Sequence, residues 1–399
     1  METLALLDTA IPGGVEQIGA DELLAMQQGD YVLRVHGGRV TQVPAEKSYL
    51  PADPQGHPQG QQVAQTADGT IYALQHTVVC KSTDGARTWS RLPDEFPEHQ
   101  HWTVRRDGVF LRATMPEGPG SSGRGRVWQS HDQGATWQKL SQFNPDLPDP
   151  WVQRYTHWGL QRLADDTLVF GMDVDQGRYE PATEPKMPDK LVGGVRSLYH
   201  MYSTDDAKSW TDPIKVADWC SEGGIAILPD GKWLATIRYG RPRLDDDPLD
   251  VCEQITSHDP AGVNVGYRLY KHLFLVESHD RGRSWCNLRQ LCTVFGQCYG
   301  YPAAVGNTVA VLHDTRYGPN PQSGRALVSH DGGDTWEDET YYVYYGISGS
   351  GYSRNVTLDD GTILTVAGIS NATNENAGSW DSWRGKTTTV AVRWRPVKT

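Results

Sequence analysis

Three side chains in the second half of the sequence carry groups that can act together on a substrate. Glu222 and Arg238 flank the turn Leu228-Pro-Asp-Gly231, and Tyr352 precedes a similar turn, Leu358-Asp-Asp-Gly361. A tyrosine beside a glutamate can act as a nucleophile, with the carboxylate as its base. An arginine nearby can hold an anionic group through two parallel hydrogen bonds. The pattern predicts a catalytic site built from Tyr352, Glu222 and Arg238.

A shared register relates these positions to one another. Glu222 and Tyr352 each lie six residues before a β-hairpin turn, and Arg238 lies seven residues after one, so all three mark the same end of their strands. The same counts place His157 and Asp173 around the turn Leu163-Ala-Asp-Asp166. We therefore expect His157 and Asp173 on a neighbouring wall of one central channel. Polar side chains also suit a channel that only holds water, so a site without chemistry stays an alternative.

One eight-residue pattern, S-x-D-x-x-x-[ST]-W, recurs along the chain. Its aspartate can accept hydrogen bonds from the backbone of its own turn, and its tryptophan can start the next strand and pack between neighbouring sheets. These roles are structural, so we expect none of the repeat aspartates to be catalytic. The five copies are Ser82–Trp89, Ser130–Trp137, Ser203–Trp210, Ser278–Trp285 and Ser329–Trp336.

Six predicted hairpins accompany these repeats and define the fold class. Their turns lie at 66–69, 105–108, 163–166, 228–231, 304–307 and 358–361. Radial repetition of small sheets predicts an all-β, six-bladed β-propeller that forms a single domain over residues 1–399.

The two ends of the chain complete this predicted ring. The sixth blade takes its hairpin from 352–369, its third strand from Thr387–Trp394 and its fourth from an N-terminal strand at Tyr31–Val35. A seventh blade from 30–56 is the alternative. Residues 1–30 are expected to form an N-terminal extension with a short helix at 15–27.

Two segments lengthen the third and fourth blades. They lie at 174–195 and 240–268, between the second and third predicted strands of each blade. Such connections emerge at the end of the blades opposite the repeat turns. Long insertions on one face of a repeat fold usually build a binding site, so both are expected to wall the central pocket.

The repeats and the Glu222 and Tyr352 stretches together resemble the sialidase superfamily and its Asp-box (BNR-repeat) propellers. The resemblance implies that Ser221-Glu222…Ile237-Arg238 carries the glutamate and one arginine of a carboxylate-binding triad, and that Gly351-Tyr352-Ser353 carries the tyrosine nucleophile. By a looser match, Arg316 would be a further arginine of the triad. Sialidases are exceptional glycosidases because their nucleophile is a tyrosine.

The resemblance fails at two points in the first part of the chain. The N-terminal Phe/Tyr-Arg-Ile-Pro motif is absent, and no loop interrupts 73–80 to carry the usual acidic residue. Asp173 or His157 could supply the missing acid. Further residues are candidates for substrate binding or for the missing arginine: Arg112, Arg154, Arg241, Tyr301 and Arg354.

Composition narrows the classes of partner. A net charge of −12 argues against nucleic-acid binding, although a local arginine cluster can still hold an anion. None of the six cysteines forms a CxxC pair, and no cofactor or metal motif occurs, so we expect neither. No basic start followed by an apolar run precedes the domain, which predicts a cytoplasmic protein without membrane contact unless a secretory leader has been removed.

Three functions remain open from the sequence. The first is an exo-acting glycoside hydrolase on an acidic or unusual sugar, with an oligosaccharide or glycoside as its partner. The second is a uronate lyase that uses His157 or Tyr352 as base and Arg238 to neutralise the carboxylate. The third is a carbohydrate-binding propeller without activity. The oligomeric state, the sugar and the linkage are not predicted.

Overall fold

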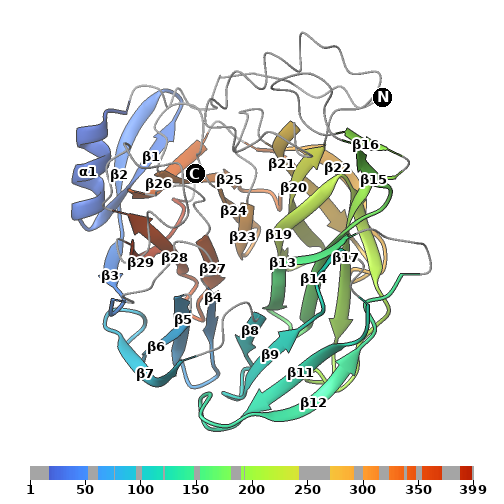
Figure 1. Ribbon diagram of the computed structural model, residues 1–399. Coiled ribbons are helices and arrows are strands. Elements are labelled where there is room, and N and C mark those ends of the chain that lie inside the picture. The colour runs from blue at the N-terminus through green and yellow to red at the C-terminus, as the bar shows by residue number, and fades with distance from the viewer. Residues whose placement is uncertain are drawn as a thin grey trace.

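The structure is a computed structural model. It describes residues 18–52, 62–75, 77–95, 101–119, 122–147, 153–180, 190–192, 194–241, 270–291, 300–313, 323–336, 339–346, 353–370 and 387–397. Six antiparallel blades, each built on four consecutive strands of a sheet, surround a common centre, as Figure 1 shows; β1 (Tyr31–His36) and β2 (Arg39–Pro44) extend one sheet and β10 (Gly118–Pro119) extends another. Each innermost strand contacts the innermost strand of the next blade around the ring. The predicted six-bladed β-propeller is therefore confirmed.

The first three blades follow the chain from the inside outward. Blade 1 contains β4 (Gln62–Gln65), β5 (Ile71–Gln75), β6 (Val78–Ser82) and β7 (Ser90–Glu95). Blade 2 contains β8 (His101–Val104), β9 (Phe110–Thr114), β11 (Gly125–Ser130) and β12 (Gln138–Phe143). Blade 3 contains β13 (Gln153–Arg162), β14 (Leu168–Asp175), β17 (Arg196–Ser203) and β18 (Ile214–Asp218).

The other three blades repeat the same order. Blade 4 contains β19 (Cys220–Ile227), β20 (Trp233–Arg241), β21 (Tyr270–Ser278) and β22 (Cys286–Gln290). Blade 5 contains β23 (Gly300–Val305), β24 (Thr308–His313), β25 (Ser323–Ser329) and β26 (Glu339–Tyr345). Blade 6 contains β27 (Ser353–Thr357), β28 (Ile363–Ser370), β29 (Thr387–Trp394) and, from the N-terminal part of the chain, β3 (Glu46–Tyr49).

An N-terminal strand closes the ring, but it is not the strand that we expected. β1 (Tyr31–His36) pairs with β26 at the outer edge of blade 5, where β2 (Arg39–Pro44) follows it, so the described part of this segment, residues 30–52, forms no seventh blade. β3 instead pairs with β29 and completes blade 6.

Burial explains this difference. β1 is more apolar than β3, and its Leu33 and Val35 are buried against Leu23 and Met26 of α1 (Ala20–Gln28). β3 reads Glu-Lys-Ser-Tyr and is only partly buried, which suits an edge strand but gives little hydrophobic signal in the sequence.

The hydrophobic core is divided among the blade interfaces. The described apolar residues form six clusters, and each cluster joins one pair of consecutive blades around the ring. The repeat tryptophans pack into these interfaces: Trp89 lies between blades 6 and 1, and Trp285 lies between blades 3 and 4. Neighbouring blades therefore stabilise one another, as expected for a fold built by repetition.

The five repeat turns share one hydrogen-bond pattern. In the second copy, the Ser130 hydroxyl donates to Asp132 Oδ1 at 2.6 Å and accepts from the Gly134 N–H at 2.8 Å. The Thr136 hydroxyl donates to Asp132 Oδ2 at 2.6 Å, and the Thr136 N–H donates to Oδ1. These bonds, first from Ser130 and then from Thr136, lower the pKa of Asp132 from 3.8 to about 2. Each repeat aspartate is therefore committed to its own turn.

The repeat turns and the innermost hairpin turns share one end of the ring, which we call the turn face. Ion pairs between blades connect them there: Arg281 Nη2 lies 2.6 Å from Asp165 Oδ2, and Lys232 Nζ lies 2.7 Å from Asp334 Oδ1. The opposite end, where innermost strands begin, is called the loop face. The connection from β14 to β17 emerges there and contains the hairpin of β15 (Arg178–Glu180) and β16 (Lys190–Val192).

We predict that the repeat aspartates make the fold sensitive to acid. Because the folded pKa of Asp132 is depressed, its contribution to stability is present above 3.8 and is lost as the pH falls toward about 2. Asp132→Asn should reduce stability at neutral pH. The variant should then lose less stability than the unmodified protein as the pH falls through this range. Urea unfolding across this range tests the effect, with the exposed Asp212→Asn as control. An unchanged pH dependence in Asp132→Asn would contradict it.

Candidate functional site

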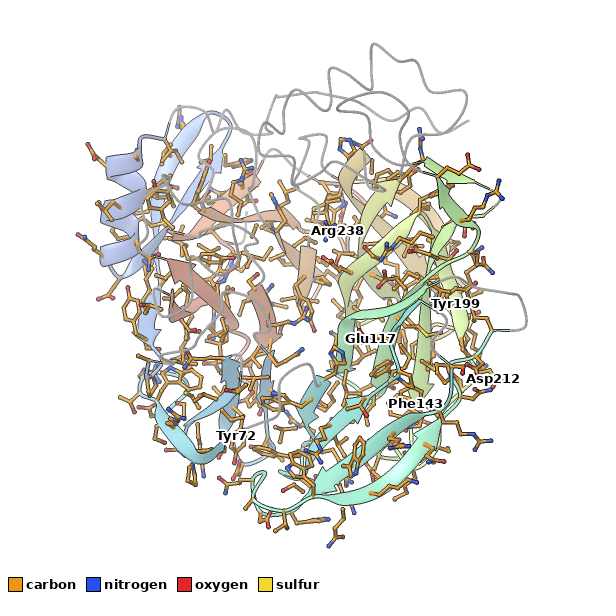
Figure 2. The ribbon with its side chains drawn as sticks, viewed as in Figure 1. Tyr72, Glu117, Phe143, Tyr199, Asp212 and Arg238 are labelled. Atoms are coloured by element: carbon orange, nitrogen blue, oxygen red, sulfur yellow. The ribbon has the colours of Figure 1, made fainter. Side chains whose placement is uncertain are left out.

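Glu222 and Arg238 form a buried ion pair at the loop-face end of blade 4. Arg238 Nη1 donates to Glu222 Oε1 at 2.6 Å, and the two side chains are 5% and 1% exposed. Glu222 lies near the start of the innermost strand β19, and Arg238 lies near the end of β20. Figure 2 shows Arg238 on the inner side of blade 4, whereas Asp212 lies at the outer edge of the ring. The hairpin register therefore predicted a real contact.

A β-bulge sets the position of Glu222. The pairing of β19 with β20 shifts between Ser221 and Gly223, so Glu222 is the extra residue. Gly223 allows the two strands to approach closely, because a Cβ at this position would lie 1.8 Å from the carbonyl oxygen of Thr236. Bulges often redirect a side chain beside a functional site. Here the bulge places the carboxylate next to the guanidinium of Arg238.

Blade 3 has a similar irregularity in its innermost strand. The pairing of β13 with β14 shifts between Tyr155 and Gly159, and this interval contains His157. Gly159 has a φ of +64°, and a Cβ there would lie 2.1 Å from His101 Nδ1. The side chains of Arg154 and His157 lie outside the described residues, so their predicted roles stay predictions.

Asp173 belongs to a second buried cluster, one strand further from the centre. Arg196 on β17 donates to Asp173 and lies 3.4 Å from Asp175 Oδ1, and all three side chains are buried. The Trp219 N–H donates to the Arg196 carbonyl at 2.5 Å, and the Gly240 N–H donates to the Trp219 carbonyl at 2.8 Å. These backbone bonds connect the cluster to the end of β20, close to Arg238.

Tyr301 and Arg354, two predicted substrate-binding residues, lie in contact. The Arg354 guanidinium carbon lies 4.7 Å from the centre of the Tyr301 ring, as in a cation–π interaction. The Tyr301 ring also packs on β19, because a Cβ at Gly224 would lie 2.8 Å from one of its carbons. This contact connects blades 4, 5 and 6 at the loop face, two residues from Glu222.

The remaining predicted residues are placed as follows. Arg241 is half-buried at the end of β20, opposite Tyr270. Tyr352 and Arg316 lie outside the described residues. Arg112, a candidate for the missing arginine, has its guanidinium carbon 5.0 Å from the Trp128 ring and 4.5 Å from the Trp137 ring. Arg112 therefore packs against tryptophans within blade 2.

Glu117 is a candidate that the sequence did not reveal. It immediately precedes β10 (Gly118–Pro119), which leaves blade 2 and pairs with β13 at Arg154 and Gln153. Its Oε1 lies 3.9 Å from His101 Nε2, and its side chain is 42% exposed. Figure 2 shows Glu117 toward the middle of the ring. The connection that carries it is short, so an argument from long insertions passed over it.

The described site offers acidic and basic groups rather than metal ligands. Within the described ranges, no three His, Cys, Asp or Glu residues come together as a metal site. No helix in the described part of the chain is long and apolar enough to cross a membrane. The chemistry available is that of a buried ionised carboxylate, its guanidinium partner and a more exposed carboxylate.

Comparison with known proteins supports the fold. No family model matches the chain, and no curated protein matches it. Among solved structures, it is similar to a protein of unknown function from Dyadobacter fermentans (15% identity, 88% of this chain and 98% of that one, TM-score 0.54). It is also similar to an α-L-arabinofuranosidase from Fusarium graminearum (16% identity, 88% of this chain and 97% of that one, TM-score 0.53). An α-L-arabinanase from Penicillium chrysogenum, solved with arabinobiose, is a further match (13% identity, 87% of this chain and 97% of that one, TM-score 0.52). At these identities the likeness shows a shared six-bladed propeller.

The bulge at Glu222 gives a test of the site geometry. Gly223→Ala should force β19 and β20 apart and cost about 1–3 kcal/mol of stability, because the added methyl group meets backbone. Gly19→Ala is the control, since a Cβ there meets nothing within 4 Å. Thermal unfolding of both variants measures the difference. Equal stability of Gly223→Ala and the unmodified protein would contradict this geometry.

Proposed function

We propose that this protein is an exo-acting glycoside hydrolase and that Glu222 is its ionised catalytic carboxylate. The observation that carries the proposal is the buried Glu222–Arg238 pair on the bulged innermost strand. A charged pair without water is costly, and folding alone rarely requires one. The loop-face location agrees with this role, since binding residues of repeat folds gather on the face that carries the insertions.

The surroundings of the carboxylates suggest a division of roles. Glu222 lies next to a guanidinium, which compensates its negative charge, so it suits a nucleophile or base that must be an anion. Glu117 is more exposed, and its Oε1 lies 3.9 Å from His101 Nε2. A carboxylate in that setting suits the acid that protonates a leaving group. Glycoside hydrolysis commonly uses two carboxyl groups with different surroundings.

The fold relatives direct the first substrate test to a neutral sugar. Arg238 faces Glu222, and Arg196 faces Asp173 and Asp175, so these two arginines are already engaged by carboxylates. The arabinofuranosidase and the arabinanase with the same fold act on such sugars. We infer that terminal arabinofuranosides are the first substrates to test. The sialidase-like mechanism through Tyr352 is the competing prediction for acidic sugars.

Replacement of Glu222 should abolish turnover for a chemical reason and not through unfolding. Glu222→Gln should lower kcat on an aryl α-L-arabinofuranoside by at least about 100-fold, as expected for loss of a catalytic carboxylate. It also leaves Arg238 uncompensated, which costs about 3–5 kcal/mol of stability. The double variant Glu222→Gln/Arg238→Gln removes both charges, so it should recover stability but not turnover. Initial rates and urea unfolding of the three proteins separate the two effects.

Product analysis decides between this proposal and its competitors. Release of free arabinose that depends on Glu222 supports it. Turnover of sialosides alone, abolished by Tyr352→Phe, would instead favour the acidic-sugar mechanism. An unsaturated uronate product would identify a lyase, and binding of oligosaccharide without any product would identify a carbohydrate-binding propeller. Full activity of a folded Glu222→Gln variant would overturn the assignment of this residue.

A further inference from the structure

A cavity opens at the turn-face end of the central channel, away from Glu222. Its volume is about 300 Å³, and all six blades contribute to its wall. Ile225 to Ile227 at the end of β19 belong to it, whereas Glu222 lies near the start of the same strand. Ile225, the nearest of these along β19, lies three residues from Glu222, a span of about 10 Å in a β-strand, so the two sites are separate. The residues that matter here are Gln65, Arg106, Arg162, Asp166 and Asp359.

Arg162 is a buried cation with unused hydrogen-bonding capacity in this cavity. Its side chain is 9% exposed, and its Nη2 donates to the Gln65 carbonyl at 2.5 Å. Its Nη1 is buried and has no hydrogen-bond acceptor among the described residues. The carboxylate oxygen of Asp166 lies 3.8 Å from Nε, which is beyond hydrogen-bond distance. A buried guanidinium N–H without an acceptor is costly.

The other described charged groups around the cavity do not supply an acceptor for Arg162 Nη1. Arg106 Nη1 lies 3.1 Å from Asp359 Oδ1, but both side chains are about half exposed, so solvent weakens this pair. Burial lowers the pKa of Arg162 to about 10; Asp166 opposes this shift, Arg106 adds to it, and Asp359 and Asp107 also oppose it. Two guanidinium groups and the carboxylates of Asp166 and Asp359 therefore line a small cavity, and Arg162 is the buried one of the two cations.

Most other polar groups in the wall are already paired. Gln161 Nε2 donates to the Ile225 carbonyl at 3.0 Å, and Asn355 Nδ2 donates to the Tyr301 carbonyl at 2.8 Å. The Gln65 Oε1 atom accepts from the Asp359 N–H at 3.0 Å. Apolar side chains of β19 and β23 cover much of the rest. The wall is thus preformed, and Arg162 Nη1 is a donor in it without an acceptor among the described residues.

We propose that this turn-face cavity binds a small oxyanion, a carboxylate or phosphate group, through Arg162 and Arg106. The bound anion would accept from Arg162 Nη1 and would lie between two positive charges. Guanidinium groups bind such anions through paired hydrogen bonds. The site is independent of the hydrolase proposal, because none of its residues belongs to the Glu222 cluster.

Titrations with acetate and with inorganic phosphate, at constant ionic strength set by sodium chloride, test this site. Either anion should raise the melting temperature of the full-length protein with a saturable dependence. Arg162→Gln should weaken the apparent affinity by at least about tenfold, the effect of losing one charged hydrogen bond. Arg281→Gln is the matched control, because it removes a turn-face arginine that is outside the cavity.

A second variant separates loss of anion binding from misfolding of Arg162→Gln. Arg162→Gln also loses the bond to Gln65, so Arg106→Gln, which changes a more exposed side chain, should weaken binding in the same direction. Binding of either anion that depends on both arginines supports the proposal. The anion that binds shows whether the site takes a carboxylate or a phosphate group. Absence of saturation, an equal response to chloride, or unchanged binding in both variants would overturn it and leave a channel that holds only water.

Discussion

A buried carboxylate that carries a charge needs a positive partner close by, and this requirement applies to Glu222. Arg238 supplies the partner from the neighbouring strand, at 2.6 Å. β19 bulges at Glu222, and Gly223 lets β20 approach closely at the same point. Removal of one member would strand the other charge in a low-dielectric interior. The local strand geometry, and with it the shape of blade 4, is therefore tied to this ion pair.

The two faces of the propeller are built from different interactions. On the turn face, each repeat aspartate is bound within its own turn, and ion pairs such as Arg281–Asp165 connect neighbouring blades. On the loop face, buried charges and aromatic contacts gather at the ends of the inner strands, among them Glu222–Arg238 and Arg354–Tyr301. A rigid ring on one side can hold reactive groups in fixed positions on the other.

Short-range regularities in the sequence predicted much of this arrangement. The repeat turns and hairpin turns act locally, so their residues predict the number of blades and the register that brings Glu222 to Arg238. The closing strand was assigned to the wrong segment, because β3 is a polar edge strand whose pairing with β29 depends on long-range geometry. Arg112 shows the same limit, since only packing reveals its contacts with Trp128 and Trp137. Glu117 depends on β10 crossing between blades, and two residues of strand leave no pattern in the sequence.

Chemical rescue tests the central claim, that Glu222 acts at the reacting centre, most directly. Glu222→Ala removes the carboxylate and leaves space for a small anion. With an aryl α-L-arabinofuranoside as substrate, added azide should restore turnover in proportion to its concentration, and mass spectrometry should detect a glycosyl azide if the anion attacks the sugar. A folded Glu222→Ala variant that shows no azide-dependent turnover, or that retains the activity of the unmodified protein, would contradict the account.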